Sequence, residues 1–226
     1  MPTAIITGAS RGLGRRLSQD LVARGWSLVV DGRDPEALAA VWADEPRVTA
    51  VAGDVSDPAH RRELIEAAGG QIDALVNNAS ALGPSPQPAL REYALEELRR
   101  VYEVNLFAPL ALVQLAVPRL ASGALILNVT SDASVEPYEG WGGYGSSKAA
   151  LDQLSAILGA EHPGLRVYAV DPGDMRTRLQ QDAFPGEDIS DRPLPEETAV
   201  PGLLALLEGD LPSGRYRAAE LVRAAA

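Results

Sequence analysis

Short runs of apolar, β-branched residues alternate with longer segments of helical periodicity along the whole chain. The short runs are apolar on both faces, which is typical of strands in a parallel sheet that helices cover on both sides. The strands are expected at residues 4–7, 27–30, 48–51, 74–76, 124–130, 166–170 and 215–217, and the helices at residues 12–24, 35–43, 58–68, 91–121, 144–161 and 196–208. This alternation predicts a single doubly wound α/β domain over residues 1–226, with a mostly parallel sheet of about seven strands.

Two segments between these elements are long and rich in proline, residues 80–90 and residues 175–195. Both follow predicted strands. Because ligands bind beyond the carboxyl ends of the strands in such sheets, we expect these loops to border the functional site. Residues 175–195 are the expected substrate loop.

The first strand runs directly into the segment Thr7-Gly8-Ala9-Ser10-Arg11-Gly12-Leu13-Gly14, and a helix follows at once. Glycines at a strand–helix turn allow a tight bend and let backbone N–H groups approach a pyrophosphate at the helix N-terminus. The spacing is Gly-x-x-x-Gly-x-Gly rather than Gly-x-Gly-x-x-Gly. The segment predicts a nucleotide site, and the alternative is an ordinary glycine-rich turn.

Lys148 is the only lysine among 20 basic residues, and it lies four residues after Tyr144. An ammonium group is compact, whereas the guanidinium group used everywhere else is a rigid fork. One helical turn places the two side chains on the same face, where the lysine is expected to lower the tyrosine pKa. The pair therefore predicts a general acid/base. The alternative is a surface lysine on an amphipathic helix.

Pro109 stands four residues after Asn105 inside the predicted helix of residues 91–121. Proline has no N–H to donate to the Asn105 carbonyl and clashes with it. We therefore expect the helix to kink at Asn105.

Together these motifs resemble the single-domain form of the short-chain dehydrogenase/reductase family, from Thr3 to about Ala218. The motifs that carry the resemblance are, in chain order, Thr7-Gly8-x-x-x-Gly12-x-Gly14, Asp54-Val55, Asn77-Asn78-Ala79, Asn105, Ser131, Tyr144, Lys148, Pro172-Gly173 and Thr177. Ser80 stands where the family usually has a glycine. The resemblance implies a Rossmann-type three-layer fold and an oxidoreductase that transfers a hydride between a nicotinamide dinucleotide and a carbonyl or secondary alcohol.

The resemblance also assigns roles. Tyr144 is implied to donate the proton to the carbonyl oxygen, and Ser131 to hydrogen-bond that oxygen. Lys148 is implied to tune Tyr144 and hold the nicotinamide ribose, and Asn105 to hold a water that relays protons to the lysine. The implied cofactor-binding residues are Gly8, Ser10, Arg11, Gly12, Leu13, Gly14, Arg33, Asp54, Val55, Asn78, Ala79, Tyr144, Lys148, Pro172, Gly173, Met175 and Thr177.

The end of the second strand bears on the choice of cofactor. In this register the acidic position that would accept from the 2′-OH of NAD falls on Gly32, and Arg33 follows it. Arg33 and Arg11 could both hold the 2′-phosphate of NADP. Asp31 is one residue away, so a shift of register would favour NAD instead. NADP(H) is the preferred prediction.

Composition narrows the partners. A formal net charge of −11 argues against nucleic acid and anionic membranes. The chain has no cysteine, and its two histidines, His60 and His162, lack partners at ligand spacing, so no metal site is expected. The first residues show no leader pattern, and the apolar stretch 106–117 is too short to span a bilayer. A soluble cytoplasmic protein acting on a small molecule is expected.

The physiological substrate is not specified by the sequence. Asp132 and the aromatic residues Tyr138, Trp141 and Phe184 flank the expected cleft, which fits a carbonyl or alcohol of medium size. The resemblance further implies a homodimer or homotetramer paired through the helices at 91–121 and 144–161. The alternative function is a non-catalytic dinucleotide-binding sensor or scaffold of the same fold, although such a protein would be expected to lose the tyrosine or the lysine.

Overall fold

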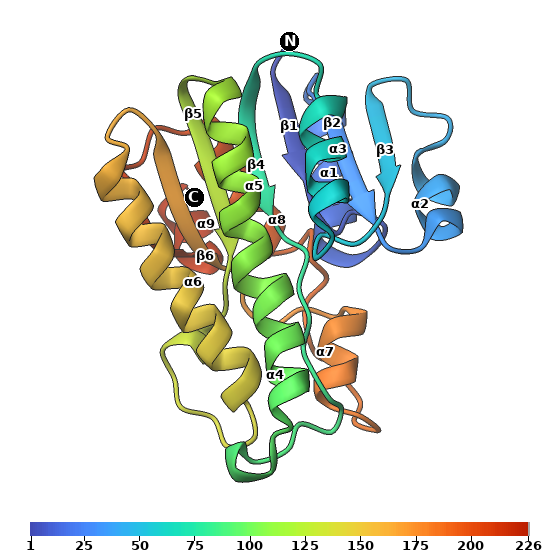
Figure 1. Cartoon of the computed structure of the whole chain (residues 1–226), viewed down its shortest axis with the longest axis vertical. Helices are drawn as coiled ribbons and strands as arrows, with labels where there is room; N and C mark the ends of the chain where they lie inside the picture. The colour runs from blue at the N-terminus through green and yellow to red at the C-terminus, as the bar shows by residue number, and fades with distance from the viewer. Residues whose placement is uncertain (226) are drawn as a thin grey trace.

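The computed structural model describes residues 1–225, and its centre is a seven-stranded sheet (Figure 1). All neighbouring strands pair in parallel, in the order β3-β2-β1-β4-β5-β6-β7. The strands are β1 (Thr3–Ile6), β2 (Ser27–Gly32), β3 (Val48–Ala52), β4 (Ile72–Asn77), β5 (Leu120–Val129), β6 (Arg166–Asp171) and β7 (Gly214–Arg217). The order reverses between β1 and β4, so a crevice is expected beyond the carboxyl ends of these two strands.

Helices cover both faces of the sheet, which confirms the doubly wound architecture (Figure 1). In the view of Figure 1, α3, α4, α5 and α6 lie in front of the sheet, and α8 and α9 lie behind it. The helices are α1 (Gly12–Ala23), α2 (Pro35–Trp42), α3 (Pro58–Ala67), α4 (Leu95–Tyr102), α5 (Ala108–Ala116), α6 (Gly142–Glu161), α7 (Arg178–Ala183), α8 (Ala199–Glu208) and α9 (Ala218–Ala225).

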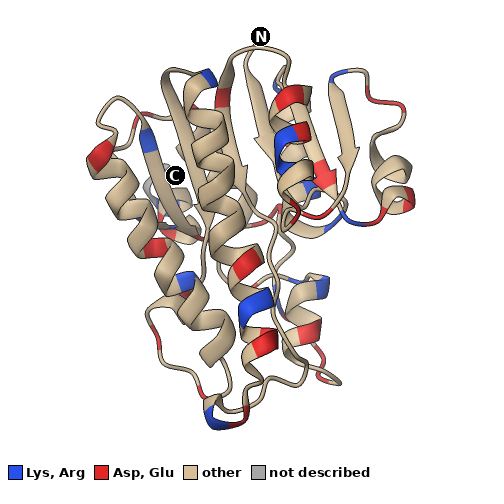
Figure 2. Ribbon diagram, viewed as in Figure 1, with Lys and Arg blue, Asp and Glu red and all other residues tan. Residues whose placement is uncertain are grey.

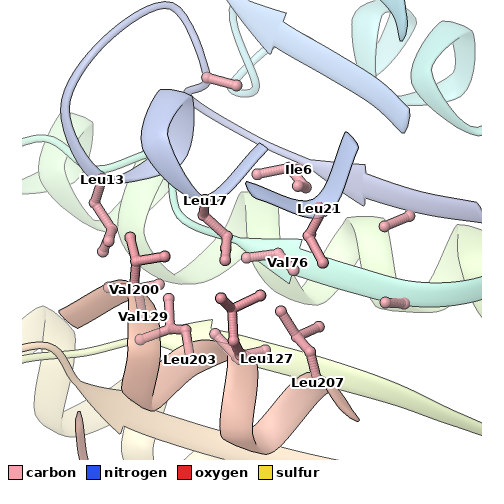
Figure 3. Packing of buried hydrophobic residues seen from close by; sticks show 14 of the residues in the cluster. Ile6, Leu13, Leu17, Leu21, Val76, Leu127, Val129, Val200, Leu203 and Leu207 are labelled. Carbon is pink, nitrogen blue, oxygen red and sulfur yellow. The ribbon is translucent and has the colours of Figure 1, made fainter. Parts of the chain in front are cut away.

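The alternation of strand side chains builds two separate cores. Ile6, Val76 and Leu127 point to the face covered by α1 and α8, where Leu17 and Leu203 meet them (Figure 3). Their sequence neighbours Ile5, Leu75 and Ile126 point to the opposite face, against α3 and α5. Successive residues of a strand face opposite sides, so both must be apolar when both faces are covered. This is why the strands lack an alternating polar pattern.

A long helical run passes from α4 through a π-helical turn at Glu103–Phe107 into α5. Asn105 lies in the middle of this turn, so the regular helix is interrupted where Pro109 predicted an irregularity. The run Leu95–Arg119 has the length and apolar composition of a membrane span. Its apolar side chains Leu112 and Val113 belong to the core under the sheet, whereas its exposed charges gather on α4 (Figure 2).

Several element predictions need correction. The segment 175–195 contains the short helix α7, started by the Thr177 hydroxyl, which accepts from the Gln180 N–H at 3.3 Å. The expected helix at 196–208 begins only at Ala199, and β5 begins at Leu120 rather than at residue 124. Helix α9 was missed because its pattern is short and close to the chain end. The remaining predicted strands and helices are present, with shifts of a few residues at their ends.

Candidate active site and cofactor pocket

A cavity of about 1210 Å³ lies where the strand order reverses, and it brings together residues from most of the predicted motifs. Its walls come from the glycine-rich turn, the ends of β2, β3, β4 and β5, helix α6, and the start of the segment 175–195. The predicted residues that line it are Gly8, Ser10, Arg11, Gly12, Leu13, Arg33, Asp54, Val55, Asn78, Ala79, Tyr144, Lys148, Pro172, Met175 and Thr177.

The glycine-rich turn is shaped by its neighbours as well as by its own glycines. Gly8 and Gly12 have φ values of 71° and 56°, which side chains rarely adopt. A Cβ on Gly14 would lie 2.5 Å from both the Gly8 carbonyl oxygen and the Asn78 Nδ2. The Asn78 amide donates to the carbonyls of Thr7 and Gly8 at 2.8 and 3.1 Å. Gly14 therefore permits close packing and does not line the cavity, and Asn78 holds the turn in place.

The N-terminus of α1 opens toward this cavity without a side-chain cap and without an acidic residue in its first turn. Uncapped N–H groups at a helix start attract anions such as a pyrophosphate. Arg11 and Arg33 line the same region. The donors and charges present therefore fit the phosphates of a dinucleotide.

The end of β2 carries the residues that bear on the choice between NADP and NAD. A Cβ on Gly32 would already lie 3.0 Å from the Ser10 Cβ, so the position where the family places an acidic residue is crowded here. Asp31 is 1% exposed, and its carboxylate accepts from the Gly8 N–H at 2.5 Å. In the turn after β3, burial tends to raise the pKa of Asp54, but hydrogen bonds from Ser56, with help from Arg33, hold that pKa below its usual value.

Tyr144 and Lys148 face the cavity from α6, at the end opposite to the phosphate region. Both side chains are buried, at 6% and 2% exposure. The Lys148 ammonium donates to the Val129 carbonyl at 2.8 Å and lies 5.5 Å from the centroid of the Tyr144 ring. This distance confirms the prediction that the two side chains share one helix face. The burial of Lys148 against β5 contradicts the alternative of a surface lysine.

The predicted lowering of the Tyr144 pKa is wrong for the protein alone. Burial raises the Tyr144 pKa to about 12, although hydrogen bonding with Ser80 and Ser131 opposes the shift. Burial also lowers the Lys148 pKa to about 8. The ammonium is directed at a backbone carbonyl rather than at the phenol oxygen, so loss of hydration outweighs its attraction for a phenolate.

Ser131 follows β5 and lies beside Tyr144, but its hydroxyl already has two partners. It donates to the Asp132 carboxylate at 2.9 Å and accepts from the Ala133 N–H at 3.2 Å. Its backbone carbonyl accepts from Arg215 Nη2 at 3.0 Å, from strand β7. Sequence reasoning missed Arg215, because nothing in a short late strand indicates a contact 84 residues away.

Asn105 is fully buried beneath the cavity. Its side-chain oxygen accepts from the Ala81 N–H at 2.8 Å and from the Ser80 hydroxyl at 3.2 Å. Its amide donates to the Ala81 carbonyl and to the Ser147 hydroxyl, both at 2.9 Å. The side chain therefore fastens the loop after β4 to α6. Any proton relay at this position would have to use the backbone carbonyl that Pro109 leaves without its usual donor.

Other predicted residues shape the site from its border. Gly173 does not line the cavity; it has a φ of 76° and donates its N–H to the Asp171 carboxylate at 2.9 Å. Residues that line the cavity but were not assigned include Gly53, Gly83, Glu97, Arg100, Thr130, Arg178 and Asp182. Most of them lie in loops or on α4, and no sequence motif connects these segments to the cavity. In the described part of the chain no group of three or more acidic or histidine side chains could hold a metal ion.

The comparison with known proteins agrees with this geometry. The short chain dehydrogenase family model matches residues 2–188. Benzil reductase ((S)-benzoin forming) of Saccharomyces cerevisiae is 33% identical over 193 residues, which cover 79% of this chain and 73% of that protein. The chain therefore belongs to the short-chain dehydrogenase/reductase family and is an NAD(P)-dependent oxidoreductase.

Solved structures with the same fold include the KRED1-Pglu enzyme, which is 34% identical with a TM-score of 0.86 and aligns with 96% of this chain and 100% of its own. A short chain dehydrogenase of Escherichia coli CFT073, solved in complex with NADPH, is 25% identical with a TM-score of 0.87, and the alignment covers 96% of each chain. The seven-stranded parallel sheet is thus the sheet of this family.

Proposed function

We propose that the protein is an NADP(H)-dependent carbonyl reductase in which Tyr144 is the proton donor. The observation that carries this proposal is one cavity with two chemically different ends. The uncapped helix α1 with Arg11 and Arg33 forms the phosphate-binding end. The buried pair of Tyr144 and Lys148 forms the reactive end.

The raised pKa of Tyr144, about 12, keeps its hydroxyl protonated at neutral pH. A protonated phenol can donate to a carbonyl oxygen, so this state favours reduction over oxidation. Ser131 lies beside Tyr144 and would fix the same oxygen once its hydroxyl turns away from Asp132. Bound NADPH supplies the hydride. Lys148, held by the Val129 carbonyl, places a positive charge beside the phenol that has lost its proton.

The preference for NADP(H) rests on the end of β2. Arg33 and Arg11 can pair with a 2′-phosphate, and Gly32 provides no carboxylate at the position that would select NAD. Asp31, the competing candidate, is turned into the protein interior toward Gly8. The related structure in complex with NADPH is consistent with this choice.

An aromatic ketone is the substrate class that the surroundings of Tyr144 support best. Trp141 contacts Tyr144 edge-on with ring centroids 5.8 Å apart, and Phe184 lies 5.9 Å from Trp141. The ring of an aromatic substrate could add to this group of rings, because aromatic rings pack favourably edge-to-face or offset-stacked. The name of the yeast relative, a reductase of benzil, points to the same class.

The test is oxidation of NADPH by the purified protein over a panel of ketones and diketones, beginning with benzil. We expect turnover of at least one aromatic ketone, and loss of that turnover in Tyr144→Phe with NADPH binding retained. Tyr216→Phe is the matched control, because Tyr216 lies on the edge strand β7 and, within residues 1–225, its hydroxyl hydrogen-bonds the Pro212 carbonyl alone. NADPH binding without turnover of any carbonyl would favour the sensor or scaffold alternative.

We further propose a homo-oligomer that pairs through α4, α5 and α6, and a cytoplasmic location. Leu95, Phe107 and Ile157 are 65%, 50% and 47% exposed on this side of the molecule. Val101 of α4 does not contribute to this surface, because it is buried and lines the cavity. Sedimentation velocity at micromolar concentration tests the oligomer, and a strict monomer would reject it.

A further inference from the structure

At the phosphate-binding end of the cavity, Asp31 forms a buried acid–histidine pair with His60, a residue to which the sequence assigned no role. Asp31 is 1% exposed and His60, on α3, is 5% exposed. The two side chains meet at 3.1 Å, between His60 Nε2 and Asp31 Oδ2. The other carboxylate oxygen accepts from the Gly8 N–H at 2.5 Å. The pair therefore connects α3 to the first glycine of the cofactor turn.

The imidazole ring of His60 is packed closely against the chain. A Cβ on Gly53 would overlap the imidazole, so the ring lies directly on the backbone after β3. His60 Nδ1 is buried and has no hydrogen-bond partner among the described residues. A neutral ring that carries its proton on Nε2 satisfies this arrangement, because the proton then goes to Asp31 and the bare Nδ1 needs no acceptor.

Asp31 is also one of the residues that line the cavity. A carboxylate at the end of the second strand of this fold accepts from the 2′-OH of NAD, and it repels the 2′-phosphate of NADP. In this chain the carboxylate is bonded on both oxygens and directed inward. Of these two contacts, the Gly8 N–H belongs to the backbone, and the His60 contact is the only one made by a side chain.

We propose that His60 determines the preference for NADP(H) over NAD(H) by holding the Asp31 carboxylate against the Gly8 N–H and away from the cofactor's 2′ position. His60 is thus a positioning residue that acts through Asp31, and the inference rests on the proposed NADP(H) dependence. Without His60, the buried carboxylate of Asp31 would keep one hydrogen-bond donor, the Gly8 N–H. A buried charge with so few partners is energetically costly. Because Asp31 lines the cavity, a carboxylate released by His60 would turn into the cavity and toward a bound cofactor.

The test measures the dissociation constants of NADPH and NADH by isothermal titration calorimetry, which requires no substrate. The informative quantity is the ratio of the NADH constant to the NADPH constant. His60→Leu keeps the volume of the side chain but not the hydrogen bond, and we expect the ratio to fall by about tenfold, the effect of one charge contact. A misfolded fraction lowers the fitted number of binding sites for both cofactors alike and leaves the ratio of the constants intact.

Two further variants isolate the route through Asp31. In the Asp31→Asn background, His60→Leu should leave the ratio unchanged, because no carboxylate remains to be released. His60→Gln, whose amide can still donate to Asp31, should keep most of the ratio of the unmutated protein. His162→Leu is the matched control, since this second histidine lies at the end of α6.

The outcomes separate the inference from the proposed function. An unchanged ratio in His60→Leu, or an equal fall in the Asp31→Asn background, would overturn the role of His60 while leaving NADP(H) dependence intact. If His60→Leu cannot be purified in folded form, Asp31→Asn alone provides the test. A selective weakening of NADH binding in Asp31→Asn would mean that Asp31 already contacts the ribose, and it would overturn the inference. If the unmutated protein binds NADH as tightly as NADPH, the proposed cofactor preference itself fails.

Discussion

The two ends of the cavity differ in how their buried polar and charged groups are stabilised. At the phosphate-binding end, buried polar groups are paired: Asp31 has two donors, and Asn78 bonds the carbonyls of Thr7 and Gly8. At the reactive end, burial works against the charged forms of Tyr144 and Lys148, and their pKa values are shifted to about 12 and about 8. The first arrangement stabilises the fold, whereas at neutral pH the buried ammonium of Lys148 in the second reduces its stability.

This difference shows where rigidity and reactivity are placed. A binding site for a polyanion needs N–H groups in fixed positions, and paired neighbours hold them there. A proton donor needs a group whose charged form is disfavoured until the reaction requires it. Changes at the first end should therefore act on stability and cofactor binding, and changes at the second end on turnover.

The largest expected effect is on turnover. Lys148→Arg should lower kcat on any substrate found in the panel by about 10²–10⁴-fold, because a guanidinium fork cannot occupy the space of a buried ammonium that donates to Val129. Steady-state kinetics measures the change, and NADPH titration shows whether binding survives. Arg62→Lys, at an exposed position of α3, is the control. A fully active Lys148→Arg protein would contradict the role given to the reactive end.

The next effect concerns the rigid end. Gly14→Ala places a methyl group 2.5 Å from the Gly8 carbonyl oxygen and the Asn78 amide, so the turn must shift. We expect a loss of about 2–3 kcal/mol in the free energy of unfolding, typical of overpacking, together with weaker cofactor binding. Urea denaturation measures the first quantity. Gly70→Ala, where a Cβ would meet nothing within 4 Å, should change little, and an equal loss in both variants would count against this explanation.

A smaller effect is expected at the cofactor's 2′ position. Arg33→Ala should weaken NADPH binding by about tenfold to hundredfold and leave NADH binding nearly unchanged, because one charge-assisted phosphate contact is removed. Calorimetric titration with each cofactor checks this, with Arg62→Ala as the control. Equal weakening of NADPH and NADH binding would show that Arg33 supports the turn and does not bind the 2′-phosphate.

The smallest expected effect is a gain in stability. Lys148→Met should raise the free energy of unfolding by about 1–2 kcal/mol near pH 7, because a buried ammonium is replaced by an apolar side chain. Below about pH 8 the lysine is charged in the folded and the unfolded chain, so its full burial penalty applies. From there to pH 10.5 the folded protein releases the proton before the unfolded chain does, and the penalty disappears.

Denaturation of both proteins between pH 7 and pH 10.5 measures this difference. The unmutated protein should approach the stability of Lys148→Met as the pH rises. A constant difference over this range would mean that the lysine is not buried in its charged form at neutral pH.

Much of the fold was accessible from the sequence because its signals are local. Strand–helix alternation predicted the layers, and two-sided apolar strands predicted that both faces are covered. The glycine-rich turn before α1 and the Tyr144–Lys148 pair each lie within a single segment, so a few neighbouring residues were enough to predict their local structure. The short helix α7 was missed because proline and glycine on either side of it indicated a loop.

The properties of the site depend on residues that the sequence keeps far apart. Asp31 could equally have faced a ribose or the interior, and in the folded chain its carboxylate contacts His60, 29 residues later. The Tyr144 pKa was predicted in the wrong direction because burial, which outweighs the charge of Lys148, is set by the packing of several elements. The contact of Arg215 with Ser131 joins strand β7 to the end of β5 across 84 residues. The sequence by itself determined which chemical groups are present and the elements that carry them. The tertiary structure decided their directions and charge states, because hydrogen-bond partners and loss of hydration arise only when distant segments pack together.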